Sequence, residues 1–193
     1  GGNGLRLRST DGGVTWGDDP SYYAGHFRGI AAGNGVWVAA GHTYGQSDVG
    51  LVSTTTDGAA WTPEQTGGGG YGSIAFGAGV FVAVGGDRCS VSPDGAAWSD
   101  CAISATGLGR VVFGDGLFAL VANEGIFTST DGSIWQPQAS SGGPQGLMGF
   151  GIGRWFGGSW PDTLFNSEDL ASWEMVYGDG SPAFVDAQLG YVR

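Results

Sequence analysis

The sequence predicts an all-β fold built from five copies of one short unit. The first observation is a turn signature, Ser or Thr followed two residues later by Asp, that ends at Trp16, Trp61, Trp98, Trp135 and Trp173. The second is its spacing: successive Trp residues are 45, 37, 37 and 38 residues apart, and continuing from Trp173 through the C-terminus to Trp16 gives 36. Repeats of this length made of short β segments are typical of β-propellers, and the matching last step indicates a closed ring. We therefore predict a five-bladed β-propeller of four-stranded antiparallel blades.

The third unit shows the four strands of one blade in order. Strand-like segments at 72–76, 80–84, 89–92 and 97–99 are rich in β-branched and aromatic residues, and turns containing Gly separate them. The same pattern returns in three other units. The sequence predicts a single domain over 1–193, with whole blades at approximately 27–64, 71–101, 108–138 and 146–176.

The two ends of the chain supply the fifth blade. Residues 183–193 match the first two strands of the other units, and the segment from Leu5 to Trp16 matches the last two. We expect one blade over 183–193 plus 1–20, which would remove an open sheet edge. Asp186 stands where other blades have Ala or Phe. Three interpretations of Asp186 remain: it pairs with Arg6 or Arg8, it lies at a more solvated terminus, or it is a catalytic carboxylate.

The turn signature carries a family resemblance. Ser9-Thr10-Asp11-Gly12-Gly13-Val14-Thr15-Trp16 resembles the Asp-box, or BNR repeat, of sialidases, sortilin-type receptors, glycan-binding propellers and a propeller assembly factor of photosystem II. The other copies are one residue shorter, and Leu170 replaces Gly in the last. In this family the Asp accepts backbone hydrogen bonds across the turn, away from the active centre. The resemblance therefore implies a structural role for Asp11, Asp57, Asp94, Asp131 and Asp169.

Charge and composition exclude several classes of partner. The chain has seven Arg, no Lys and eighteen acidic residues, for a net charge of −11. This charge argues against nucleic acid and against anionic membranes. No stretch is long and apolar enough for membrane insertion. We predict no cofactor and no bound metal.

Two cysteines indicate the compartment. Cys89 and Cys101 each lie six residues from Gly95, so a hairpin that turns there places them opposite each other. An even pair in this register favours a disulfide, although two free thiols remain an alternative. A disulfide predicts a secreted, cell-surface or periplasmic protein.

Candidate binding residues lie in the loops that join blades and that join second to third strands. The unusual side chains there are Tyr22, Tyr23, His42, Tyr44, Tyr71 and Trp160. Sugar sites combine a flat aromatic face with planar amides or carboxylates. Such groups occur nearby at Gln46, Gln65, Gln145 and Asp162. The sequence thus predicts a carbohydrate-binding module, with surface loops of no binding role as the alternative.

An enzyme is the less favoured hypothesis. The arginines at 28, 88, 110 and 154 fall at different repeat positions, whereas sialidases need several converging on a carboxylate. The innermost-strand segments 29–31, 73–75, 110–112, 147–149 and 183–185 contain no acid, whereas five-bladed glycosidases need two or three carboxylates in the axial pocket. We therefore predict that the chain is not an enzyme. Two alternative functions remain: a sialidase-like glycoside hydrolase, and a subunit of a surface protein assembly that docks through one propeller face. The strongest objection to a non-catalytic chain is that residues 42–48, together with Asp87 and Glu124, form a metal or acid–base site.

Overall fold

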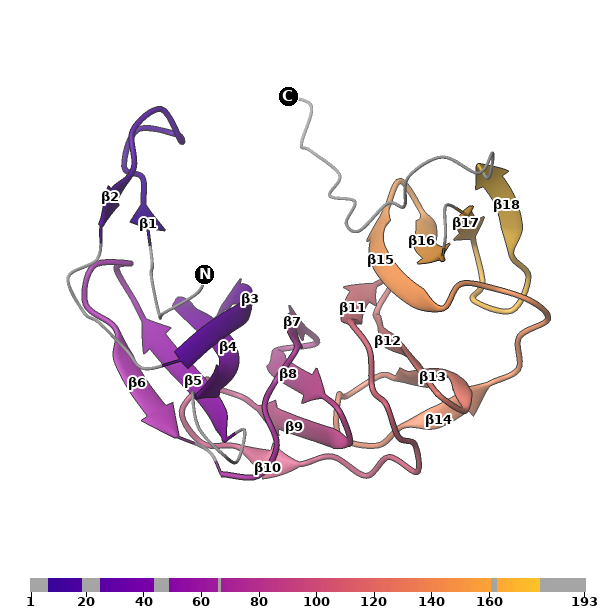
Figure 1. Ribbon diagram of the computed structural model, residues 1–193, viewed down its shortest axis with the longest axis horizontal. Coiled ribbons are helices and arrows are strands. Elements are labelled where there is room, and N and C mark those ends of the chain that lie inside the picture. The colour runs from indigo at the N-terminus through magenta and orange to yellow at the C-terminus, as the bar shows by residue number, and fades with distance from the viewer. Residues whose placement is uncertain (1–6, 19–24, 44–48, 66, 161–162, 178–193) are drawn as a thin grey trace.

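The described part of the chain contains strands and no helix. The computed structural model (Figure 1) describes residues 7–18, 25–43, 49–65, 67–160 and 163–177. Within these ranges every regular element is a β-strand. The all-β prediction is therefore confirmed, and no helix there could span a membrane.

The strands form one two-stranded sheet and four four-stranded antiparallel sheets. The short sheet pairs β1 (Leu7–Arg8) with β2 (Gly17–Asp18). The next contains β3 (Gly25–Gly33), β4 (Val36–Thr43), β5 (Gly50–Thr55) and β6 (Thr62–Gln65). The third contains β7 (Ser73–Gly77), β8 (Val80–Gly85), β9 (Arg88–Ser92) and β10 (Ser99–Asp100). The last two contain β11 (Val111–Gly114), β12 (Leu117–Ala122), β13 (Gly125–Ser129) and β14 (Gln136–Gln138), then β15 (Gly146–Gly151), β16 (Arg154–Ser159), β17 (Thr163–Ser167) and β18 (Glu174–Tyr177).

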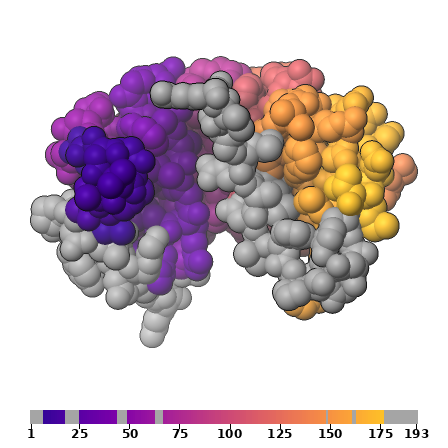
Figure 2. All heavy atoms as spheres, turned by 90° about the horizontal axis from the view of Figure 1, so that it is seen from above, coloured from indigo at the N-terminus to yellow at the C-terminus, as the bar shows by residue number. Residues whose placement is uncertain are grey.

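The sheets follow one another along an arc. In each large sheet, strands that are consecutive in the chain are also neighbours in space. Strands β3, β7, β11 and β15 contact one another in that order, and Figure 1 shows them along the inner side of the arc. The first and last described sheets lie at opposite ends of the molecule (Figures 1 and 2). The strands predicted at 183–193, with Asp186, lie outside the described residues, so the described part shows consecutive sheets rather than a closed ring.

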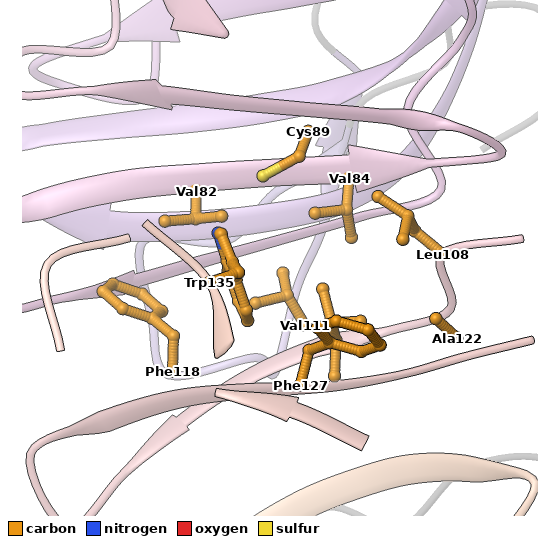
Figure 3. Close-up of a cluster of buried hydrophobic side chains, with 10 residues drawn as sticks. Val82, Val84, Cys89, Leu108, Val111, Phe118, Ala122, Phe127 and Trp135 are labelled. Carbon is orange, nitrogen blue, oxygen red and sulfur yellow. The ribbon is translucent and has the colours of Figure 1, made fainter. Parts of the chain in front are cut away.

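Apolar side chains fill the spaces between neighbouring sheets. In the cluster of Figure 3, Val82 and Val84 of one sheet pack against Phe118, Leu120 and Phe127 of the next, and all five are at most 5% exposed. Equivalent clusters join the sheets on either side. Burial between sheets, rather than within one sheet, therefore provides the core.

Glycine allows the innermost strands to pack closely. A Cβ added to Gly77, the last residue of β7, would lie 2.1 Å from the ring of Phe113 in the next sheet. The same close approach joins Gly114 to Phe150. Any side chain at these glycines would displace an aromatic ring that fixes the spacing of two sheets.

The sheet of β3–β6 has one exposed apolar face. Ile30 is 56% exposed and Trp37 is 48% exposed. The corresponding residues of the following sheet, Ile74 and Phe81, are 8% and 0% exposed because the preceding sheet covers them. Ile30 and Trp37 thus lie on the face that every later sheet buries.

Candidate functional site

The molecule has two edges of different character. Turns that join the third to the fourth strand of each sheet carry the Ser/Thr-x-Asp signature, and we call this side the box edge. The opposite side, which we call the loop edge, holds the connections from second to third strands and from one sheet to the next. The box edge repeats one structure, while the loop edge differs from sheet to sheet.

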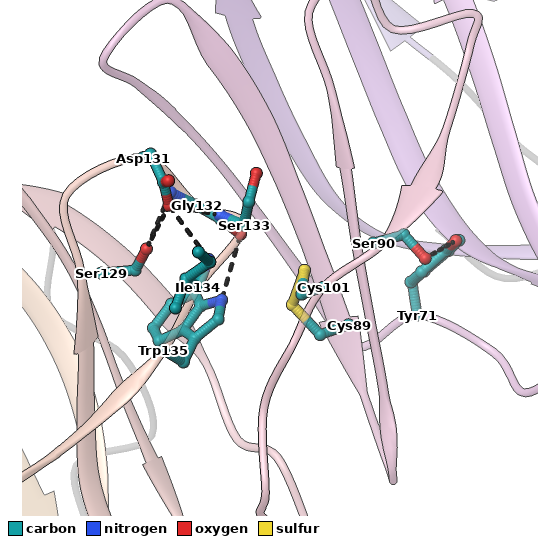
Figure 4. The surroundings of a disulfide bond; sticks show 10 residues. All are labelled: Tyr71, Cys89, Ser90, Cys101, Ser129, Asp131, Gly132, Ser133, Ile134 and Trp135. Atoms are coloured by element: carbon teal, nitrogen blue, oxygen red, sulfur yellow. Dashed lines mark hydrogen bonds between the residues drawn. A yellow bond between two sulfur atoms is a disulfide. The ribbon is translucent and has the colours of Figure 1, made fainter.

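An Asp carboxylate organises each box turn. Asp131 Oδ1 accepts the backbone N–H groups of Ser133 and Ile134 at 2.8 and 3.0 Å, and the Ser129 hydroxyl at 3.0 Å. The indole N–H of Trp135 donates to the turn backbone at 3.0 Å (Figure 4). The other described turns use the same kind of carboxylate bonds at Asp11, Asp57, Asp94 and Asp169.

These hydrogen bonds lower the pKa of each box Asp, because they favour the charged carboxylate. At Asp11 the Thr15 hydroxyl, followed by the Thr15 backbone N–H, lowers the pKa from 3.8 to about 2. At Asp131 the backbone N–H of Ile134 is the largest cause of a lowered pKa. The pKa values of Asp57, Asp94 and Asp169 are lowered for the same reason. Charge at the box edge therefore serves the turns themselves.

In the turns at Asp94, Asp131 and Asp169, the residue after the box Asp packs on the preceding sheet. A Cβ at Gly95 would lie 2.5 Å from Val38, and one at Gly132 would lie 2.5 Å from Val82. Leu170 occupies this position in the last turn, with φ 64° and 1% exposure. It keeps the left-handed backbone that favours glycine and adds a buried side chain between two sheets. The boxes therefore join sheets as well as closing hairpins.

A cleft of about 700 Å³ opens at the loop edge. It is bounded by the sheets of β3–β6 and β7–β10 and by the start of β11. Its charged or titratable lining side chains are Arg28, His42, Asp87 and Arg110, and six of its twelve lining residues are Gly. A second hollow of about 600 Å³ shares Gly69 and Asp87 with it. Together they form a polar depression with much bare backbone.

Two arginines from different sheets line this cleft. Arg28 is the extra residue of a β-bulge, because the β3–β4 register shifts between Phe27 and Gly29. Such bulges redirect a side chain relative to the regular alternation of a strand. Arg110 immediately precedes β11, and both arginines are exposed. The sequence analysis did not predict that these two arginines line one cleft, because they occupy different repeat positions. A usable signal was that each stands just before the apolar residues of an innermost strand.

The carboxylates of Asp87 and Glu124 hold a loop. Asp87 Oδ1 accepts the Gly107 backbone N–H at 2.8 Å, and Glu124 accepts the Thr106 backbone N–H at 2.9 Å and the Thr106 hydroxyl at 2.8 Å. The bond from the Thr106 backbone is the main cause of a lowered pKa at Glu124. Both acids thus fix the connection before β11. Among the described residues, no group of three or more His, Cys, Asp or Glu side chains is placed to hold a metal ion.

Tyr71 is a core residue. Its side chain is 1% exposed, and its hydroxyl donates to Ser90 Oγ at 2.9 Å. The Arg88 guanidinium lies 4.7 Å from the centre of its ring, and Arg88 Nη1 donates to the Gly69 carbonyl. The ring therefore packs between two sheets and is not the exposed aromatic face that the sequence predicts, although Tyr71 is one of the residues that line the cleft.

His42 lies at the cleft beside a second histidine. Its ring centre is 5.2 Å from that of His26, its cross-strand partner. Burial, and then the nearby His42 and Arg28, lower the pKa of His26. Both imidazoles are partly buried. His26 therefore favours its neutral form, while His42 presents a polar group to the cleft.

Among the aromatic candidates that the structure describes, Trp160 has an exposed ring. It is 77% exposed at the end of β16. Its backbone N–H donates to Gln145 Oε1 at 3.1 Å, and the Gln145 N–H donates to Ser159 Oγ at 2.9 Å. The aromatic and amide groups expected together are thus neighbours here. The other candidates, Tyr22, Tyr23, Tyr44, Gln46 and Asp162, lie outside the described residues.

The predicted disulfide is present. Cys89 of β9 and Cys101, which follows β10, are joined across 12 residues with a Cα–Cα distance of 5.3 Å (Figure 4). Their backbones are also hydrogen-bonded, Cys101 N–H to Cys89 O at 3.0 Å. The bond fixes the start of the connection that leads to Arg110 and the cleft.

Comparison of this chain with family models and with curated proteins found no match. No protein-family model matches it, and no curated protein matches it. Solved structures similar to it include one from the GH130 family of mannoside phosphorylases, which contains glycoside hydrolases that target β-1,2 mannosidic linkages in Candida mannan: 14% identity, 77% of this chain, 68% of that chain, TM-score 0.45.

Two further solved structures are also similar to this chain. HIRA(644-1017) is 9% identical over 81% of this chain and 54% of its own, with a TM-score of 0.46. A glycosyl hydrolase from Bacteroides ovatus is 12% identical over 79% of this chain and 49% of its own, with a TM-score of 0.36. The chain spans about half the length of these two.

The neighbours correct one prediction. Two of the three are described as glycoside phosphorylases or hydrolases, so the expectation that this chain is not an enzyme is contradicted and we withdraw it. At these identities and scores the likeness concerns the fold and establishes no activity.

Proposed function

We propose that this protein binds carbohydrate in the cleft at the loop edge. The observation that carries the proposal is a cleft of about 700 Å³ in which guanidinium, imidazole and carboxylate groups converge from consecutive sheets. Sugar hydroxyls need donors and acceptors of this kind, and the volume is that of ordinary ligand sites. The glycine lining leaves room for a sugar ring to approach the backbone.

Trp160 offers a separate contact at the loop edge, on the sheet of β15–β18. Its exposed ring offers the flat apolar surface on which one face of a sugar ring packs. The bond from its backbone to Gln145 fixes the position of the turn and of the amide beside the ring. Tyr22, Tyr23 and Tyr44 lie outside the described residues and remain candidate contacts in this proposal.

We propose that the fold is a five-bladed ring of Asp-box repeats, closed by residues 183–193 with the N-terminal hairpin. The exposed face at Ile30 and Trp37 supports closure, because each later sheet buries that face against its predecessor. The four described whole sheets would then be blades 27–64, 71–101, 108–138 and 146–176. The disulfide supports a location outside the cytoplasm, since such bonds are typical of oxidising compartments.

The test compares glycan binding by the intact chain with binding by a variant in which the cleft is filled. An array would identify oligosaccharides that bind the intact chain, and titration would give their affinities. Gly69→Trp fills the cleft: nothing lies within 4 Å of a Cβ at Gly69 and its φ is not positive, so a side chain fits without strain. Ala96→Trp places the same bulk on the exposed box edge as a control.

Loss of glycan binding in Gly69→Trp, with binding retained in Ala96→Trp, would support the cleft as the site. Absence of glycan binding by the intact chain, or equal binding by both variants, would refute it. Recovering the bound oligosaccharide intact or cleaved separates binding from catalysis.

A further inference from the structure

Positive charge gathers at the cleft of a strongly acidic protein. Net charge is −11 with seven Arg and no Lys. Arg28 and Arg110 nevertheless line one cleft whose lining holds a single acid, Asp87. The hollow beside it is lined by Arg88 and by two acids, Asp87 and Asp100. A chain of this charge repels anions over most of its surface, so a local cationic site determines where an acidic ligand binds.

The backbone directs these guanidinium groups to one place. The bulge at Arg28 turns its side chain away from the regular alternation of β3. Arg110 reaches the same cleft from the start of β11, two sheets further along the arc. The carboxylate-bonded loop at Thr106 and Gly107 and the disulfide at Cys101 hold the connection that leads to Arg110.

The acid in the described lining already has a partner. Asp87 accepts the Gly107 N–H at 2.8 Å, so its carboxylate is directed to the loop. His42 contributes an imidazole to the same lining. The lining glycines carry no side chain that would keep an acidic group from the guanidinium donors.

We propose that the ligand of this cleft is an acidic glycan, whose carboxylate or sulfate group is held by Arg28 and Arg110. The inference rests on the proposed carbohydrate function and specifies its ligand class. A guanidinium donates two parallel hydrogen bonds to a planar carboxylate or to two sulfate oxygens, and two such groups select an anion over a neutral sugar.

The experiment compares matched acidic and neutral probes. The intact chain is titrated with trigalacturonate and its methyl ester, and with a sulfated and a desulfated heparin oligosaccharide. We expect an acidic member to bind at least about tenfold more tightly than its neutral counterpart, because charge-assisted bonds exceed neutral ones by about that factor. The two pairs distinguish a carboxylate ligand from a sulfate ligand.

Variants then locate the contact. Arg28→Gln and Arg110→Gln should each weaken binding of the acidic probe about tenfold or more, and weaken the salt dependence. Arg8→Gln, an exposed arginine of β1 near the box edge, is the control and should bind normally. Circular dichroism of each variant confirms folding, and methyl-ester binding confirms an intact cleft.

The outcomes separate the two proposals. Equal affinity for acidic and neutral members, or acidic binding that survives both arginine substitutions, overturns the acidic-glycan proposal and leaves carbohydrate binding standing. Failure of every glycan on the array overturns both.

Discussion

The box edge and the loop edge are built from the same strands but use polar residues in opposite ways. At the box edge each Asp bonds its own turn, as Asp131 does with Ser133 and Ile134. At the loop edge Arg28 and Arg110 come from separate sheets and face a cleft. Hydrogen bonds within each turn give the box edge the same structure in every sheet and stabilise the arc. The loop edge differs from sheet to sheet, because its cleft is lined by residues from separate sheets. Repetition therefore marks the scaffold of this protein, and departure from repetition marks the proposed site.

The largest expected effect is from removing a whole box hairpin. Deleting residues 1–16 should abolish cooperative unfolding of the entire domain, because in a closed ring every sheet depends on both neighbours. Thermal unfolding followed by near-UV circular dichroism measures this. A truncated protein with the full transition of the intact chain would show that the ring is not closed by its ends.

A matched glycine pair separates turn conformation from sheet packing. Gly132 and Gly12 both have φ +74°, but a Cβ at Gly132 would lie 2.5 Å from Val82, while nothing lies within 4 Å at Gly12. Gly132→Ala should lower the free energy of unfolding by about 2–4 kcal/mol, and Gly12→Ala by about 1 kcal/mol. Urea denaturation of both variants gives the difference. Equal losses would mean that box turns do not join sheets.

The disulfide should make a moderate contribution to the free energy of unfolding. Replacing Cys89 and Cys101 by Ser should lower the free energy of unfolding by at most about 3 kcal/mol, because the loop is short and its hairpin is already ordered. Denaturation under reducing and non-reducing conditions measures it. Stability unaffected by reduction would contradict the prediction.

Acid should weaken the box edge gradually. A carboxyl whose folded pKa lies below its unfolded value stabilises the protein above the unfolded pKa, and this contribution is lost as pH falls through the folded pKa. For Asp11 that window runs from 3.8 down to about 2. The pKa values of the other box Asp residues are also lowered, so their contributions are lost below the same 3.8. The melting temperature should therefore fall across this range, and less steeply in Asp131→Asn. An unchanged slope in that variant would mean that Asp131 does not contribute.

Sequence reasoning reached the box edge because its determinants are local. Asp131, Gly132 and Trp135 lie within five residues, so the pattern alone predicted the turn, and the register around Gly95 predicted the disulfide. The loop edge depends on which connections meet in space. Tyr71 looked like an exposed aromatic loop residue, yet packing against the next strands buries it. Arg28 and Arg110 share no repeat position, and only a bulge and the contact of innermost strands bring them together.

The central claim is that the box edge stabilises the protein while the loop edge binds the ligand. Measuring both the melting temperature and the glycan affinity of Gly69→Trp and Gly132→Ala tests this claim most directly. Gly69→Trp should keep the melting temperature within about 2 °C, as exposed substitutions do, and lose glycan binding. Gly132→Ala should melt several degrees lower and, while folded, keep the affinity of the intact chain. Normal glycan binding by Gly69→Trp, or lost binding by folded Gly132→Ala, would contradict the account.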